Sequence, residues 1–148
     1  MDDEKLFEMV EECVAFAVNR LENAQTLYPF AMFLDADDNI ESLMHETEDE
    51  GQEHSYETLL ERLKEQVKKE EIKAIALLAR VTIPSHYSPA VSEGVRIHLE
   101  ERRLSGQKIG ARYLYVPYQL YKTAEIDAKI TVKLHHPIPV AFEQEIFE

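Results

Sequence analysis

Four oxygen-bearing residues have the spacing of a calcium site. They occupy the first, third, fifth and twelfth places of a segment that resembles an EF-hand loop: Asp35, Asp37, Asn39 and Glu46. The sixth place is Ile40, although the sharp turn of that loop requires glycine. The residues before Asp35 are apolar and aromatic, which is typical of a strand rather than a helix. We therefore predict a hairpin turn here and no calcium site.

The histidines and the single cysteine lack the spacing of a zinc site. No histidine belongs to a His-Glu-x-x-His frame, and we expect all six to be exposed to solvent: His45, His54, His86, His98, His135 and His136. The sequence leaves open whether His45 and His54 meet nearby carboxylates in space. Cys13 lies within an apolar helical pattern, so we expect a small buried hydrophobe in a reducing compartment.

No residue has the setting of a catalytic nucleophile. The serines lie outside any Gly-x-Ser-x-Gly elbow, and the four glycines are scattered rather than gathered into a phosphate-binding loop. The sequence thus predicts no catalytic, cofactor-binding or metal-binding residue, and no cofactor. Acid–base sites assemble from distant residues, however, so a small hydrolase or a metal-dependent enzyme remains an alternative.

Charge is distributed unevenly along the chain. The net charge is −13, of which residues 1–70 carry −14 and the rest of the chain carries +1. A run of acids forms either a solvated loop or a docking surface for a basic partner: Glu46, Glu48, Asp49, Glu50 and Glu53. Basic residues cluster around a predicted hairpin, as a solvated edge or as a patch that meets the acidic half of another subunit: Arg96, Arg102, Arg103, Lys108 and Arg112.

Hydrophobic periodicity predicts an α+β fold. Spacings of three and four predict helices over 3–24 and 56–70, the second capped by Ser55. Alternation and β-branched or aromatic content predict six strands: 28–34, 40–44, 72–83, 91–101, 109–121 and 129–135. After the last of these we expect an extended tail. The order helix, hairpin, helix, meander gives a single antiparallel sheet of five or six strands with two helices packed on a face.

One segment and the element order resemble known proteins. Residues 28–40, with the sequence YPFAMFLDADDNI, are similar to a stretch of small bacterial proteins that combine a leading helix with a "YPFA…LDADG" hairpin. Asp38 and Asn39 replace the glycine of that turn. The order of elements resembles roadblock/longin and profilin-like domains, which are mostly interaction scaffolds. The resemblance implies the hairpin and a bacterial origin, and it assigns no site.

Length and composition place the chain among globular proteins. The 148 residues suit one domain spanning 1–148, and 45% hydrophobic with 30% charged residues argues against a disordered chain. The acidic start lacks the basic region of a signal peptide, and no apolar run approaches 18 residues. We therefore expect a cytoplasmic protein. The charge of −13 argues against nucleic-acid and membrane partners.

These observations favour a non-catalytic interaction or regulatory domain. Its predicted partner is a protein, either a second copy in a homodimer or a basic protein, because the first helix has a broad apolar stripe and the charge is asymmetric. An alternative is an immunity-type protein that neutralises a basic toxin through the acidic run, since electrostatic steering speeds such capture.

Overall fold

The fold is that of a computed structural model, in which seven strands and two helices are defined. It describes residues 3–23, 29–44, 52–104, 111–122, 130–142 and 146. The helices are α1 (Asp3–Asn23) and α2 (Gln52–Lys69). The strands are β1 (Phe30–Asp35), β2 (Ile40–Met44), β3 (Ile72–Thr82), β4 (Glu93–Glu101), β5 (Ala111–Lys122), β6 (Ile130–Leu134) and β7 (Ile138–Phe142). Short 3₁₀ turns cover Ser85–Tyr87 and Arg102–Leu104.

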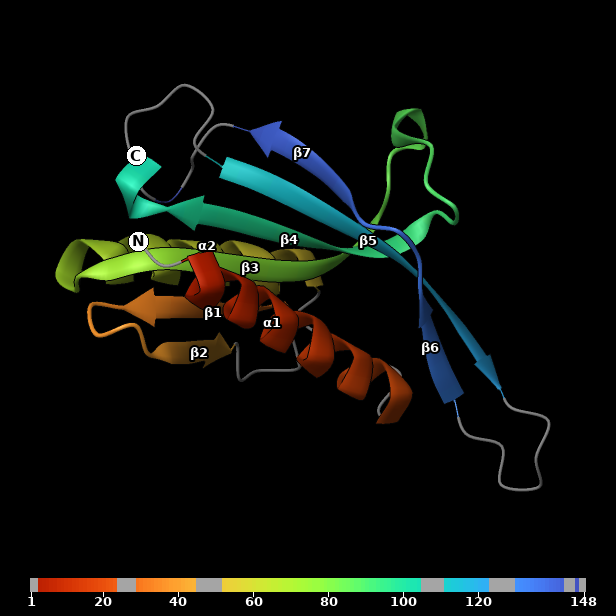
Figure 1. The fold of residues 1–148 in the computed structure, drawn as a ribbon, viewed down its shortest axis with the longest axis horizontal. Helices are drawn as coiled ribbons and strands as arrows, with labels where there is room; N and C mark the ends of the chain where they lie inside the picture. Colours follow the sequence, from red (N-terminus) through yellow and green to blue (C-terminus); the bar gives the residue numbers. More distant parts are fainter. Residues whose placement is uncertain are drawn as a thin grey trace.

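All strand pairs form one antiparallel sheet in the order β2-β1-β3-β4-β5-β6, with β7 also paired to β5. The prediction of an α+β fold with an antiparallel sheet and two helices is therefore confirmed. The sheet curls around α1, which crosses its front in Figure 1, while α2 lies behind β3. Both neighbours of β3 are other strands, which agrees with the apolar residues on both sides of this strand.

The two helices cover opposite faces of the sheet, so the expectation of helices on one face is wrong. Residues of alternate parity explain this, because successive side chains of a strand point to opposite sides. Ala74, Ala76 and Leu78 pack with α1, whereas Ile75 and Leu77 pack with α2. Each helix contributes one buried stripe: Leu6, Met9, Cys13, Ala17 and Leu21 from α1, and Leu59, Leu63 and Val67 from α2. We call these the α1 face and the α2 face.

The chain end adds a seventh strand where the sequence predicted only an extended tail. β6 pairs with the second half of β5 and β7 with the first half, so both lie along the same strand. The register changes by one residue between Tyr118↔Leu134 and Tyr115↔Ile138, around Pro137. Proline cannot donate a ladder hydrogen bond, which explains why the strand is interrupted rather than continuous. The strands after α2 are thus not a simple meander.

Local signals fixed the first hairpin but not the start of α2. The turn between β1 and β2 forms as predicted: Asp38 has φ 65°, and Asp35 Oδ1 accepts the N–H groups of Asp37 and Asn39, each at 2.9 Å. These bonds, with that from Asn39 first, lower the pKa of Asp35. Helix α2 begins at Gln52, so the predicted start beside Ser55 was wrong, and Ser55 lies within the helix.

Candidate functional site

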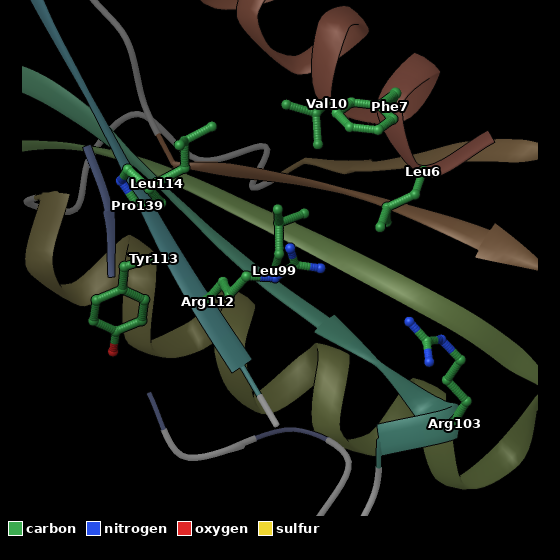
Figure 2. Close-up of a pocket in the computed structure, with 9 residues that line it drawn as sticks. All are labelled: Leu6, Phe7, Val10, Leu99, Arg103, Arg112, Tyr113, Leu114 and Pro139. Atoms are coloured by element: carbon green, nitrogen blue, oxygen red, sulfur yellow. The ribbon is translucent and has the colours of Figure 1, made fainter. Parts of the chain in front are cut away.

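An apolar groove runs along the N-terminal half of α1, where the helix faces the end of β4. Its volume is about 370 Å³. We call it the α1 groove, and it is lined by Leu6, Phe7, Val10, Leu99, Arg103, Arg112, Tyr113, Leu114 and Pro139. Figure 2 shows Leu6, Val10 and Phe7 on the helix opposite Leu99 and Leu114 on the strands. The groove therefore lies between α1 and the sheet, and aliphatic side chains from both contribute to its lining.

Phe7 is the most exposed large hydrophobic residue of the described chain, at 66%. It lies one position after the buried Leu6, on the flank of the broad apolar stripe of α1. Its neighbours on the outer side of the helix are the exposed acids Glu8 and Glu11. An exposed aromatic ring beside an apolar groove is typical of an interaction surface rather than of a solvated helix face.

Two arginines form a cationic rim on the α1 groove. Arg103 Nε donates to Glu101 Oε1 at 3.0 Å, and Arg112 Nη2 lies 3.5 Å from Glu101 Oε2. The Glu101 side chain is 3% exposed, whereas those of Arg103 and Arg112 are 54% and 56% exposed. One buried carboxylate thus anchors two guanidinium groups that stay open to solvent. The rim carries a net positive charge and can meet an anionic group.

The basic residues that the sequence grouped together have different surroundings. The guanidinium of Arg102 donates to the backbone oxygen of Val67 in α2 at 2.8 Å and to that of Ile72 in β3 at 2.6 Å. It thus satisfies a carbonyl at the end of the helix and one at the start of the next strand, which is a structural role. Arg96 lies on the α2 face, away from Arg103 and Arg112. Lys108 lies outside the described residues.

The predicted acidic docking surface is not described by the structure. Glu46, Glu48, Asp49 and Glu50 lie outside the described residues, and only the helical backbone of Glu53 is described. The acids that the structure does describe near the α1 groove are the buried Glu101 of β4 and the exposed Glu8 and Glu11 of α1. A link between the acidic run and either arginine cluster therefore stays a prediction.

His98 contradicts the expectation that every histidine is exposed. It is fully buried on the α2 face, and its Nε2 lies within hydrogen-bond distance of the buried Glu100 carboxylate. Glu100 also accepts the backbone N–H of Ile146 at 3.0 Å. The cause is tertiary: α2 and Ile146 cover a strand side whose alternation is typical of a solvated face. Nδ1 of His98 has no partner.

The remaining chemistry-bearing residues form no centre. Cys13 is buried, as predicted, and burial raises the pKa of its thiol from 9.0 to about 12, so it is a poor nucleophile at neutral pH. Within the described ranges, no three His, Cys, Asp or Glu residues come together in a group that could hold a metal ion. Asp35 and Asn39 are used within their own turn.

Comparisons with known proteins return no relative. No family model, no curated protein and no solved structure matches this chain. In the part of the chain that is described, neither helix combines the length and the apolar character needed to cross a membrane. The function must therefore be argued from the geometry of this chain alone.

Proposed function

We propose that this protein is a non-catalytic interaction domain that self-associates through the α1 groove. The observation that carries the proposal is Phe7, whose ring is 66% exposed beside the α1 groove. Burying an aromatic side chain is favourable by roughly 1.5–3 kcal/mol, and aromatic and arginine residues dominate the energetics of protein interfaces. The lone, buried Cys13 supports placing this association in a reducing compartment such as the cytoplasm.

Charge supports a second copy as the partner. The α1 groove has a rim of Arg103 and Arg112, whereas the outer side of α1 carries Glu11 and Glu8, the latter in an exposed pair with Lys5 at 3.3 Å. Phe7 and the α1 groove are adjacent on one patch, so a two-fold axis through this patch brings each Phe7 to the partner's groove. The same operation brings the acids of one helix toward the arginines of the other copy.

The first test compares two exposed aromatic residues by sedimentation velocity. We expect the wild-type chain to dimerise, and Phe7→Ser to weaken the dimer at least tenfold. Tyr121→Ser is the matched control, because Tyr121 is 49% exposed on β5, outside the residues that line the α1 groove. A wild-type monomer at high concentration contradicts the proposal, as does equal weakening by both variants.

A charge-exchange experiment tests the pairing itself. Arg112→Glu places acids opposite the acids of α1, and Glu8→Arg with Glu11→Arg places cations opposite the arginine rim. Each variant alone should be monomeric because both halves of a two-fold interface then carry like charges. An equimolar mixture should restore a dimer, because opposite charges then meet in both halves. A mixture that stays monomeric while both variants remain folded contradicts this pairing.

The immunity-type alternative is favoured by a different observation, the charge of −14 in residues 1–70. It requires neutralisation of the predicted acidic surface to abolish capture of a basic partner without unfolding the protein. The corresponding variant replaces five acids with their amides: Glu46, Glu48, Asp49, Glu50 and Glu53. Capture from lysate that is unchanged in this variant excludes the acidic run as the docking site.

A further inference from the structure

Arg96 lies on the α2 face in a setting unlike that of Arg103 and Arg112. Its guanidinium carbon is 4.4 Å from the centre of the Tyr113 ring and 5.4 Å from that of the Tyr56 ring. Arg96 Nη2 also donates to the Tyr56 hydroxyl at 2.8 Å. The cation is thus held between two aromatic rings, one from β5 and one from α2, in a fixed orientation.

No carboxylate of the described chain neutralises this cation. Arg96 makes no ion pair, and its Nε is buried without a hydrogen-bond partner. Tyrosine rings attract a guanidinium but supply no negative charge and no acceptor for most of its five N–H groups. A half-buried cation with an orphaned donor calls for an anionic ligand, because an unpaired polar group withdrawn from water is costly.

The space for such a ligand is a hollow of about 510 Å³ that Arg96 lines together with Tyr56. We call it the α2 hollow. Its apolar lining residues are Pro29, Leu60, Ala79 and Val81. Arg80 also lines it, but its guanidinium pairs with Glu93 at 3.8 Å. Glu57 is the one acid among its lining residues, and it does not pair with Arg96.

We propose that the α2 hollow binds a small organic monocarboxylate. The carboxylate accepts N–H groups of Arg96 in the planar geometry that a guanidinium offers, and the apolar part of the ligand lies against Leu60, Ala79 and Val81. Because Arg80 pairs with Glu93, Arg96 is the lining cation left to bind one negative charge, and Glu57 on the lining with a net charge of −13 disfavours dianions. This site lies on the opposite face of the sheet from the α1 groove and does not depend on self-association.

The test is a titration of the ¹⁵N-labelled protein with hexanoate, followed by amide chemical shifts. We expect saturable shifts that include Tyr56 and Arg96, and at least tenfold weaker binding of hexanamide, which keeps the chain and lacks the charge. Inorganic phosphate should give no saturable shift at those residues in the same concentration range. The comparisons with hexanamide and with phosphate both use the wild-type protein. This part of the test therefore does not depend on whether a variant folds.

Variants then assign the binding to one arginine. Arg96→Gln should weaken hexanoate binding at least tenfold, whereas Arg20→Gln, a change in the last turn of α1, should leave it unchanged. Equal binding of hexanoate and hexanamide overturns the proposal, as does undiminished binding to a folded Arg96→Gln protein. Absence of any saturable shift with hexanoate overturns it as well, because the α2 hollow then takes no such ligand.

Discussion

The two faces of the sheet handle arginine charge in different ways. On the α1 face, Arg103 and Arg112 share the carboxylate of Glu101, which is buried while both guanidinium groups stay half exposed. On the α2 face, Arg96 is half buried and faces two tyrosine rings, and no carboxylate of the described residues pairs with it. Parity along β4 explains the difference, because Arg96 and Glu101 are five positions apart and so point to opposite sides.

Arg103 and Arg112 thus neutralise a buried carboxylate, whereas the charge of Arg96 is not neutralised by any carboxylate of the described residues. In the first setting the arginines stabilise the fold and remain accessible to a partner. In the second setting the arginine adds little to stability but retains its capacity for an anion. Figure 2 shows that neighbouring residues of β5 point to the two faces: Leu114 lies on the side of α1, and Tyr113 points to the opposite side.

Removal of both rim arginines should have the largest effect on stability. Arg103→Gln with Arg112→Gln leaves the Glu101 carboxylate buried without either cation, and we expect a loss of about 2–3 kcal/mol in the free energy of unfolding. This lies at the low end for a broken buried pair because both arginines are half exposed and water replaces part of their effect. Urea denaturation measures the change.

The matched control for that variant is Arg96→Gln. This change removes no cation from a buried carboxylate. We therefore expect the free energy of unfolding to fall by about 1 kcal/mol or less, through loss of the aromatic contacts and the bond to Tyr56. If Arg96→Gln lowers the free energy of unfolding as much as the double variant does, the two settings do not differ as described, because Arg96 then neutralises a buried charge. The single change Arg112→Gln should lie near zero, since the closer Arg103 remains.

Sequence reasoning recovered what short-range physics determines. The apolar–polar alternation of residues 95–100 predicts Val95, Ile97 and Leu99 on one side of β4 and Arg96 on the other, and the structure agrees. The turn between β1 and β2 was also recovered, because Asp35 bonds to its own backbone. The strand alternation and the Asp35 turn each depend on residues a few positions apart, so both can be predicted without knowledge of the rest of the fold.

The burial of His98 and Glu100 could not be read from the sequence. An alternating strand looks the same whether its polar side faces water or is covered by elements distant in the chain. Here the cover includes α2 and Ile146, whose backbone N–H bonds to Glu100 across 46 positions. The separation of Arg96 from Arg112 was missed for a related reason: the two were taken as one patch, although strand parity places them on opposite sides, with Arg112 paired to Leu99 and Arg96 to Tyr115.

An alkaline pH series tests whether the core of the α1 face, where Cys13 lies, excludes water. Burial raises the pKa of Cys13 to about 12, so between pH 9 and 12 unfolded chains lose the thiol proton while folded chains keep it. Stability is therefore lost as pH rises above 9, by about 1 kcal/mol at pH 10. Below pH 9 both states hold the proton and the contribution is constant.

The measurement compares wild-type protein with Cys13→Ala by urea denaturation at pH 8, 9 and 10 under reducing conditions. The variant lacks the thiol, so its disadvantage at pH 8 should shrink by about 1 kcal/mol at pH 10. All other groups titrate alike in both proteins and cancel in the difference. A constant difference across this range means that solvent reaches Cys13, against the burial described for α1.

The smallest effect concerns the ring beneath Arg96. A double-mutant cycle with Arg96→Met and Tyr113→Leu should give a coupling of about 0.5–1 kcal/mol, the size of a partly desolvated cation–aromatic contact. Pairing Arg96→Met with Phe7→Ser should give no coupling, because Phe7 lies on the other face. If the ring holds Arg96 in place for an anion, hexanoate binding should also weaken in Tyr113→Leu while Arg96 remains. Coupling without that weakening means that Tyr113 stabilises the cation but does not position it for a ligand.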